Sequence, residues 1–192
     1  RLVVGLSQKE SAQLPTFLAD PDLKFRFYVG DLIRRNGKAA AVSLIGAATS
    51  ESEAVRRSSI HLLGKIARKL TAERQGEITK TVVQALVDVD PKVRRNAAIA
   101  LGDLRATTGV KTLETALNAE PFDWVRPSMV LALGQIGGEA SSAVLGRLNP
   151  RSAEETEALA KAQDRVTVID HPGREPLERF GGEREIELRS AP

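Results

Sequence analysis

One short phrase recurs along the chain, and it restricts the fold to a repeat architecture. The phrase pairs an apolar residue with a following arginine and continues to Leu-Gly, and it occurs at residues 53–66, 91–104 and 123–136. Its opening valines, Val55, Val93 and Val125, are 38 and then 32 residues apart. A degenerate earlier copy follows Asp20-Pro21. Self-similarity with a period of about 20–50 residues predicts one supersecondary unit that is stacked on itself several times.

Each copy of the phrase predicts a helix. Val93, Ala97 and Leu101 recur at helical spacing and share one face. Aspartate, glutamate or proline at the start of a copy suits the first turn of a helix. A second, shorter apolar helix is predicted after each copy, at residues 38–48, 75–87, 110–118 and 139–148. Because one helix pair cannot bury both of its apolar sides, successive pairs must stack to make a continuous core.

The predicted fold is therefore an all-α solenoid that spans residues 1–150. Residues 8–19 are interpreted as the second helix of a still earlier pair, kinked or shifted by Pro15. Asn36-Gly37 and Thr108-Gly109 are predicted as turns within pairs, where glycine takes left-handed geometry after a helix.

The pattern changes over residues 151–192. A helix is predicted at 152–164, where Ser152 and Glu155 have the spacing of a capping box. Residues 165–170 and 184–189 alternate in polarity and predict two short strands, a C-terminal β-hairpin. A lone hairpin is marginally stable, so this part is interpreted either as a cap on the last repeat or as the start of a following domain.

The pattern Asp-Pro-x-Val-Arg-x-x-Ala-x-x-Ala-Leu-Gly at residues 90–102 resembles the HEAT-like repeats first named for phycobilisome lyases. The resemblance covers roughly residues 8–148, and it implies an armadillo-like α-solenoid. It also implies that the arginine after the valine pairs with acidic residues of adjacent repeats. Arg56, Arg94 and Arg126 hold that position and are expected to be structural, whereas Lys24 replaces the arginine in the first copy and Glu51 replaces the aspartate in the second.

Catalytic chemistry has little support in the sequence. The chain has no cysteine, which excludes a thiol nucleophile and cysteine-ligated zinc. HEAT-type deoxyhypusine hydroxylases hold iron with repeated His-Glu dipeptides, whereas this chain has only His61 and His171 and no such dipeptide. Asp123-Trp124 resembles the aspartate and aromatics of HEAT-type DNA glycosylases, but we interpret it as a helix cap and a packing aromatic. We therefore expect no enzyme activity, no metal, no cofactor and no small-molecule substrate.

Charge is segregated along each repeat. The formal net charge is +3, with acidic residues at the starts of the first helices and basic residues at their ends. The candidate basic edge consists of Arg34, Arg35, Lys38, Lys65, Arg68, Lys69, Arg105 and Lys111. Bases at helix ends complement the helix dipole by roughly 0.3–1 kcal/mol each, but their clustering also suits a polyanionic partner.

The sequence therefore predicts a non-catalytic scaffold or adaptor that binds a protein partner. One alternative is an accessory nucleic-acid-binding module of a larger enzyme that modifies RNA or DNA, and another is a lyase-type chromophore-attachment subunit. In such arrays the second helices usually line the concave face, which here would carry a mixed set of Ser43, Lys80, Gln84, Lys111 and Glu114. The lack of cysteine favours a cytoplasmic location, and no apolar stretch approaches the roughly 20 residues of a membrane span.

Overall fold

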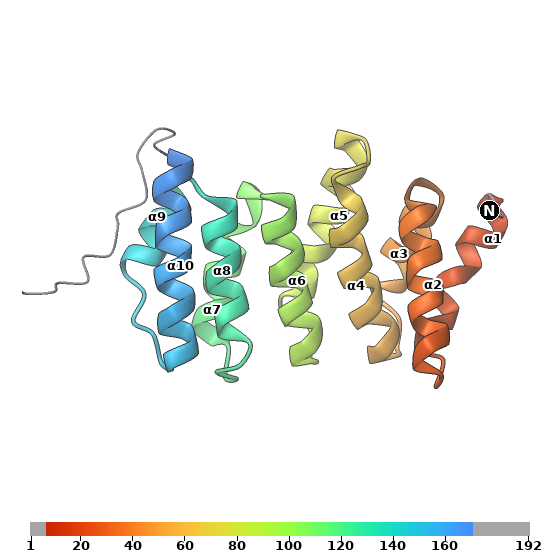
Figure 1. Ribbon diagram of the computed structural model, residues 1–192, viewed down its shortest axis with the longest axis horizontal. Helices are drawn as coiled ribbons and strands as arrows, with labels where there is room; N and C mark the ends of the chain where they lie inside the picture. The colour runs from red at the N-terminus through yellow and green to blue at the C-terminus, as the bar shows by residue number, and fades with distance from the viewer. Residues whose placement is uncertain (1–6, 171–192) are drawn as a thin grey trace, which may run out of the picture.

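A computed structural model describes residues 7–170, which form a row of stacked helix pairs (Figure 1). The first helices of the pairs lie side by side and are α2 (Leu23–Arg35), α4 (Glu53–Ala67), α6 (Pro91–Leu104), α8 (Arg126–Ile136) and α10 (Ala153–Asp170). The second helices are α3 (Gly37–Ala47), α5 (Ala72–Ala85), α7 (Val110–Ala119) and α9 (Gly138–Gly146). The short helix α1 (Gln8–Gln13) and the 3₁₀ segment η1 (Leu14–Ala19) precede α2, and the 3₁₀ segment η2 (Thr107–Gly109) precedes α7. The predicted all-α solenoid is confirmed.

Aspartates and prolines start several of these helices, as the sequence predicts. The carboxylate of Asp22 accepts hydrogen bonds from the backbone N–H groups of Lys24 and Phe25 at the start of α2. Asp90 does the same at the start of α6, where Pro91 occupies the first turn. At the N-terminal end of the array, the α-helix changes to 3₁₀ geometry at Leu14–Ala19, next to Pro15. The ring of Pro15 thus has the effect expected from the sequence.

The glycine of each Leu-Gly pair marks the point where neighbouring first helices come closest. A Cβ atom added to Gly64 would lie 2.8 Å from the Cβ of the alanine that faces it, and one added to Gly134 would lie 2.5 Å from a backbone Cα. The facing pairs are Gly64 with Ala100, Gly102 with Ala132, and Gly134 with Ala162. Because only glycine fits at these contacts, the repeat phrase sets the spacing of the first helices.

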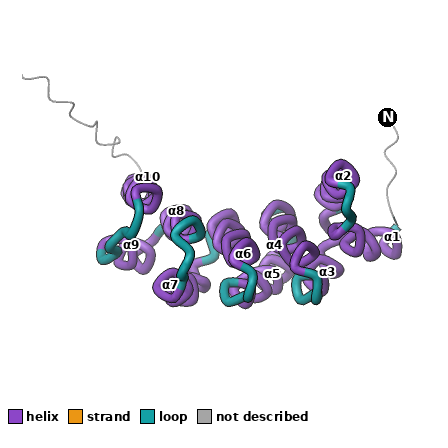
Figure 2. The backbone as a smooth tube through the Cα atoms, turned by 90° about the horizontal axis from the view of Figure 1, so that it is seen from below, coloured by secondary structure: helices purple, strands orange, loops and turns teal. Residues whose placement is uncertain are grey.

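The array is curved, and the first helices line its concave side (Figure 2). This corrects the expectation that the second helices, with Ser43, Lys80, Gln84, Lys111 and Glu114, line that side. The glycine–alanine contacts pull the first helices together, and no comparable glycine contact joins consecutive second helices among the described residues. The more closely spaced layer must lie on the inside of the curve.

The C-terminal part differs from its prediction. Residues 165–170, predicted as a strand, form the end of α10. Ala158, Ala162 and Val166 are buried and recur four residues apart along one face of α10, which packs against α8. Packing along this stripe outweighs the local β-propensity of the β-branched residues. The second predicted strand, 184–189, lies outside the described residues.

Two local predictions are also wrong. Gly37 and Gly109 are not left-handed, and the left-handed residue that ends α6 is Arg105, with φ of 51°. Gly37 and Gly109 instead pack closely, since an added Cβ would lie 3.3 Å from Ile66 and 3.1 Å from Leu101.

None of the described helices is long and apolar enough to cross a membrane.

The third wrong prediction concerns Asp123 and Trp124. No side chain caps α8, which begins three residues after Asp123. Trp124 is 48% exposed and contacts Phe122 rather than the core. Both residues lie in the turn before α8, where the backbone N–H of Val125 donates to the carbonyl of Phe122, and both side chains are on the surface.

Candidate binding groove

The contact between α2 and α4 is unlike the other contacts between first helices. Gly30 of α2 faces Leu62 of α4, whose Cδ2 would be 3.8 Å from a Cβ added to the glycine. Leu62 stands two residues before Gly64, the position that alanine occupies in α6 and α8. The larger side chain keeps α2 farther from α4 and leaves a groove between them.

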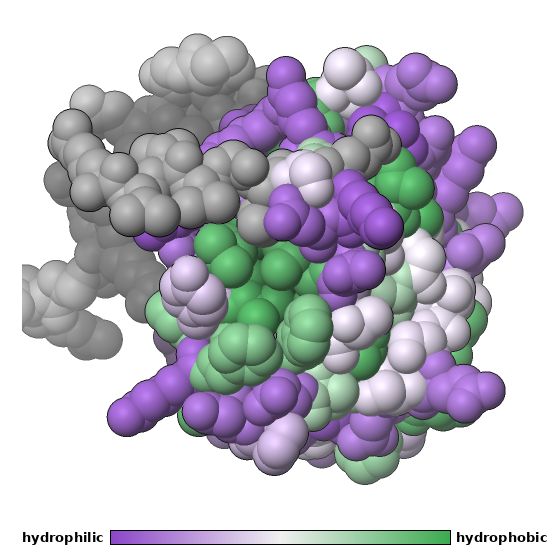
Figure 3. All heavy atoms as spheres, turned by 90° about the vertical axis from the view of Figure 1, so that its right-hand side faces the viewer, coloured by the Kyte–Doolittle hydropathy of each residue, from purple (hydrophilic) through white to green (hydrophobic). Residues whose placement is uncertain are grey.

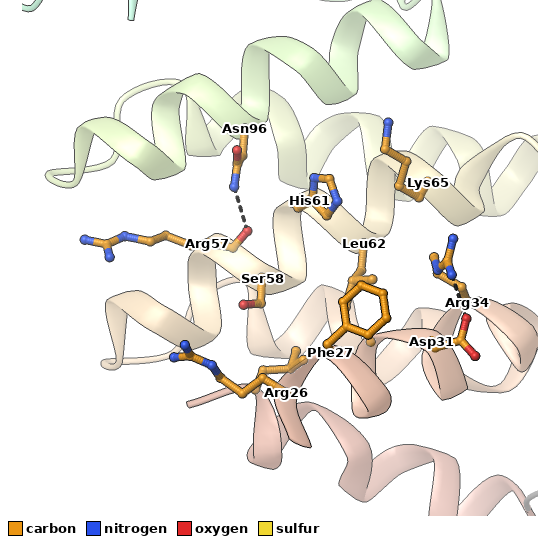
Figure 4. Close-up of a pocket in the computed structure, with 12 residues that line it drawn as sticks. Arg26, Phe27, Asp31, Arg34, Arg57, Ser58, His61, Leu62, Lys65 and Asn96 are labelled. Carbon is orange, nitrogen blue, oxygen red and sulfur yellow. Dashed lines mark hydrogen bonds and ion pairs between the residues drawn. The ribbon is translucent and has the colours of Figure 1, made fainter. Parts of the chain in front are cut away.

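The groove has a volume of about 450 Å³ and combines an apolar floor with a basic rim. Leu18 and Leu62, both almost completely buried, form its floor. Phe27 lies over this floor in the middle of the groove, and its side chain is 77% exposed (Figure 4). The polar lining residues are Arg26, Asp31, Arg34, Arg57, Ser58, His61, Lys65 and Asn96. These residues come from α2, α4 and α6, so the groove depends on the stacking of successive repeats.

The cations of the groove differ in how fully they are paired. Arg57 donates hydrogen bonds to Asp90 and Glu53, and Asn96 donates to the backbone carbonyl of Arg57 at 2.9 Å. Lys65 pairs with Asp103 at 2.9 Å. Arg26 makes no ion pair within residues 7–170. The groove therefore keeps an excess of positive charge after its internal pairs are formed.

His61 lies on the α4 side of the groove, between Arg57 and Lys65 (Figure 4). Loss of hydration lowers the pKa of His61, and the nearby charge of Lys65 lowers it further. The side chain is therefore a neutral donor and acceptor at neutral pH, and the positive charge of the groove comes from arginine and lysine.

A second hollow, of about 590 Å³, adjoins the groove at the turns between first and second helices. The two share Asp31 and Arg34. Arg34 and Arg35 both pair with Asp31, each at 2.6 Å, and the hydrogen bond from Arg34 lowers the pKa of Asp31. Lys38 and Lys69 also line the hollow and make no ion pair with any described residue.

The structure thus brings only part of the predicted basic edge together. Arg34, Arg35, Lys38 and Lys69 surround the hollow, and Lys65 lines the adjoining groove. The other three members, Arg68, Arg105 and Lys111, line neither cavity.

The three repeat arginines form a regular ladder along the opposite edge. Each guanidinium makes two hydrogen bonds to one carboxylate of the next repeat. Each also donates to a backbone carbonyl, which lies in the preceding connection for Arg56 and Arg94 and near the end of α7 for Arg126. The pairs are Arg56 with Asp88 at 2.8 and 3.0 Å, Arg94 with Glu120 at 2.7 and 2.8 Å, and Arg126 with Glu155 at 2.9 and 2.6 Å. The carboxylates of Asp88, Glu120 and Glu155 are therefore neutralised within the fold.

The last rung of this ladder is the most deeply buried. The side chains of Arg126 and Glu155 are 2% and 0% exposed. Burial by itself raises the pKa of Glu155, but hydrogen bonds from the guanidinium of Arg126 and the backbone N–H of Arg151 outweigh it, and the net pKa is lowered. Glu155 consequently serves the ion pair, while the backbone N–H of Glu155 still donates to the Ser152 hydroxyl, which is one half of the predicted capping box.

Sequence reasoning missed the three groove residues Arg26, Phe27 and Leu62. Leu62 stands where the later copies of the phrase have alanine, and this difference signals that α2 and α4 are spaced differently from the other first helices. Phe27 had a weaker signal, because aromatic side chains on a helix more often belong to the core.

The chemistry available at the groove is that of recognition. It offers apolar contact area, several fixed cations and a few neutral hydrogen-bonding groups. No group of three or more histidine, aspartate or glutamate side chains within residues 7–170 is arranged to hold a metal ion.

Comparisons with known proteins agree with this architecture. Residues 79–162 match the family model of HEAT repeats. A comparison with curated proteins gives no match. Among solved structures, the complex of CpcE and CpcF of phycocyanin lyase from Nostoc sp. PCC7120 is similar, with a TM-score of 0.62 and 21% identity over 87% of this chain. The match covers 66% of that protein's chain.

Two further structures show the same fold. A designed armadillo repeat protein matches with a TM-score of 0.54 and 18% identity over 83% of each chain. The archaeal HEAT-like repeats protein from Thermococcus onnurineus NA1 matches with a TM-score of 0.53 and 15% identity, over 85% of this chain and 65% of that one. Residues 7–170 therefore form an armadillo-like α-solenoid, within which residues 79–162 match the HEAT-repeat family model.

Proposed function

We propose that this chain is a non-catalytic scaffold whose N-terminal repeat binds a protein partner. The observation that carries the proposal is the concentration of exposed apolar side chains at that end of the array. They are Phe17, Leu23, Phe25, Phe27 and Tyr28, each at least 38% exposed. Seen from the N-terminal end, apolar residues gather in the middle of the face within a surround of hydrophilic residues (Figure 3). A contiguous apolar surface with a polar rim marks an interaction site.

The architecture supports the same proposal. Solenoids present extended concave surfaces, and they use them to hold other macromolecules. The similar phycocyanin lyase chain is itself part of a complex between CpcE and CpcF. That likeness supports a lyase-type role at the level of the fold alone, whereas the apolar surface belongs to this chain.

Nucleic-acid binding is a second candidate, and the basic hollow is the observation that favours it. Lys38 and Lys69 lack carboxylate partners among the described residues, and Arg34 and Arg35 share the single carboxylate of Asp31. Such a cluster attracts phosphates. However, Phe27 is the only aromatic residue that lines the adjoining groove, so the series of stacking platforms used for single strands is absent there.

Site-specific photocrosslinking tests the protein-binding proposal. A benzoylphenylalanine at Tyr28 replaces one exposed aromatic with another. The matched control is the same group at Val42 of α3, which is similarly exposed, at 56% against 59%. We expect a discrete protein adduct from position 28 alone. The captured protein is then purified, and its affinity for the wild-type chain is measured by calorimetry.

The outcomes separate the two candidates. A purified partner that binds the wild-type chain and crosslinks only at position 28 supports the proposal. The same adducts from both positions, or none from position 28, would contradict it. Salt-sensitive binding of RNA or DNA without any protein adduct would favour the second candidate.

A further inference from the structure

The groove between α2 and α4 and the adjoining basic hollow form one continuous surface. They share Asp31 and Arg34, so a ligand in the groove can extend directly into the hollow. The groove supplies apolar area from Leu18, Phe27 and Leu62. The hollow adds the unpaired cations Lys38 and Lys69 to Arg26 of the groove. A ligand that fits both halves is apolar in one part and anionic in the adjacent part.

We infer that this surface binds an acidic segment of a partner protein, with one large apolar side chain in the groove and neighbouring carboxylates in the basic hollow. The inference rests on the proposed function and names the chemistry of the segment that the N-terminal repeat recognises. The ligand is a peptide rather than a nucleic-acid strand, because the floor of the groove is aliphatic and Phe27 is the single aromatic residue of its wall.

Charge complementarity is the main argument for an acidic segment. Arg26 at one end of the surface, and Lys38 and Lys69 at the other, make no ion pair within residues 7–170. Asp31 is the only carboxylate that lines either cavity, and two guanidiniums already hold it. A basic segment would therefore meet uncompensated repulsion, whereas carboxylates on the ligand would complete the pairing.

Space is the argument for a large apolar side chain. The groove exists because Gly30 faces Leu62 across a wider gap than the gaps at the other glycine contacts. Its volume of about 450 Å³ admits a leucine or phenylalanine side chain with adjoining backbone. Seating such a side chain against Phe27 and Leu62 removes apolar surface from water on both partners.

Fluorescence anisotropy with defined peptides tests the inference. The probe is a labelled twelve-residue peptide in which one leucine precedes a run of glutamates. One control peptide has serine in place of the leucine, and another has lysine in place of the glutamates. We expect the probe to bind at low salt, to bind at least tenfold more tightly than either control peptide, and to weaken as salt is added.

Two variants of the protein address the two halves separately. Gly30→Leu fills the groove and keeps every charge, and it stays compatible with the helix because leucine is a better helix former than glycine. Lys38→Glu with Lys69→Glu reverses the hollow and leaves the groove open. The matched control, Lys80→Glu with Lys92→Glu, makes the same change of net charge at exposed lysines that line neither cavity. We expect at least tenfold weaker binding for the first two variants and less than a twofold change for the control, with circular dichroism showing that all three remain folded.

The results distinguish this inference from the proposed function. If a partner crosslinks at position 28 but the leucine–glutamate probe does not bind, the acidic-segment inference fails and the scaffold proposal stands. Equal losses in the Lys80/Lys92 control would show non-specific attraction and would overturn the inference. Competition by a twelve-nucleotide single strand that depends on Lys38 and Lys69 but survives Gly30→Leu would assign the surface to nucleic acid instead.

Discussion

At the scale of single residues, the ion pair between Arg126 and Glu155 is the contact most sensitive to substitution. Both side chains are buried, and Glu155 has no exposed surface to recover hydration if its partner is lost. We expect Arg126→Ala to lower the free energy of unfolding by about 3–5 kcal/mol, because it leaves an uncompensated buried carboxylate. Urea unfolding followed by circular dichroism measures the change.

Two comparisons test that explanation. Lys161→Ala breaks an exposed pair with Glu157 within α10 and is expected to change the free energy of unfolding little. Replacing both buried partners, Arg126→Met with Glu155→Leu, removes the stranded charge and should recover most of the loss. Equal effects of Arg126→Ala and Lys161→Ala would show that burial is not the cause.

Ser59 is a residue whose replacement should stabilise the fold rather than destabilise it. It occupies the position that alanine holds at residue 97 of the repeat phrase, and its buried hydroxyl has no hydrogen-bond partner. An unsatisfied buried hydroxyl is costly. We expect Ser59→Ala to stabilise the fold by about 1 kcal/mol, measured as a higher urea midpoint with an unchanged m-value. A lower midpoint would mean that the hydroxyl makes a stabilising contact.

At the scale of whole helices, the glycine contacts determine how the first helices stack. The Cβ of Gly134→Ala would lie 2.5 Å from the backbone of α10 at Ala162, so the two helices must separate. We expect a loss of about 1–3 kcal/mol, as for other overpacked contacts. The matched control is Gly76→Ala in α5, where nothing lies within 4 Å and the gain in helix propensity is up to about 1 kcal/mol. In thermal unfolding, the midpoint temperature should fall for Gly134→Ala and rise for Gly76→Ala.

The helices also show how far the sequence alone can go. The arginine, the Leu-Gly pair and the apolar spacing predict the helix pairs and their order, because each reports a local requirement of the stack. The strand prediction at residues 165–170 failed because burial of Val166 in the packed face of α10 overrides local β-propensity. The groove could not be predicted, since it depends on how far Leu62 holds α2 from α4, and that distance is a property of two packed backbones.

At the scale of the whole molecule, curvature and charge act together. The first helices face inward, so the groove lies on the concave side, where a bound segment contacts successive repeats. The ladder of arginines neutralises Asp88, Glu120 and Glu155 on one edge. The unpaired cations of the other edge remain available to a ligand. One edge of the array is therefore more positively charged than the other.

Acid should destabilise the whole array in two pH ranges. The pKa of His61 is lowered from 6.5, by loss of hydration and by Lys65 and Arg34, while Asp103 acts in the opposite direction. The folded state therefore binds fewer protons than the unfolded state as the pH falls through 6.5, and stability is lost there. The pKa values of Glu155 and Asp90 are lowered from 4.5 and 3.8 because the hydrogen bonds they accept outweigh the effect of burial. Their contribution is complete above pH 4.5 and is lost below it.

Urea unfolding at intervals between pH 7.5 and 3 tests both ranges. We expect a modest fall in the free energy of unfolding between about pH 7 and 5.5, and a larger fall below about pH 4.5. His61→Gln should remove the first fall and leave the second, since glutamine does not titrate and keeps a polar side chain at the groove wall. Stability that increased on acidification from pH 7 to 5.5 in the wild-type chain but not in His61→Gln would mean that protonated His61 is favoured in the folded state, and that a carboxylate such as Asp103 controls it.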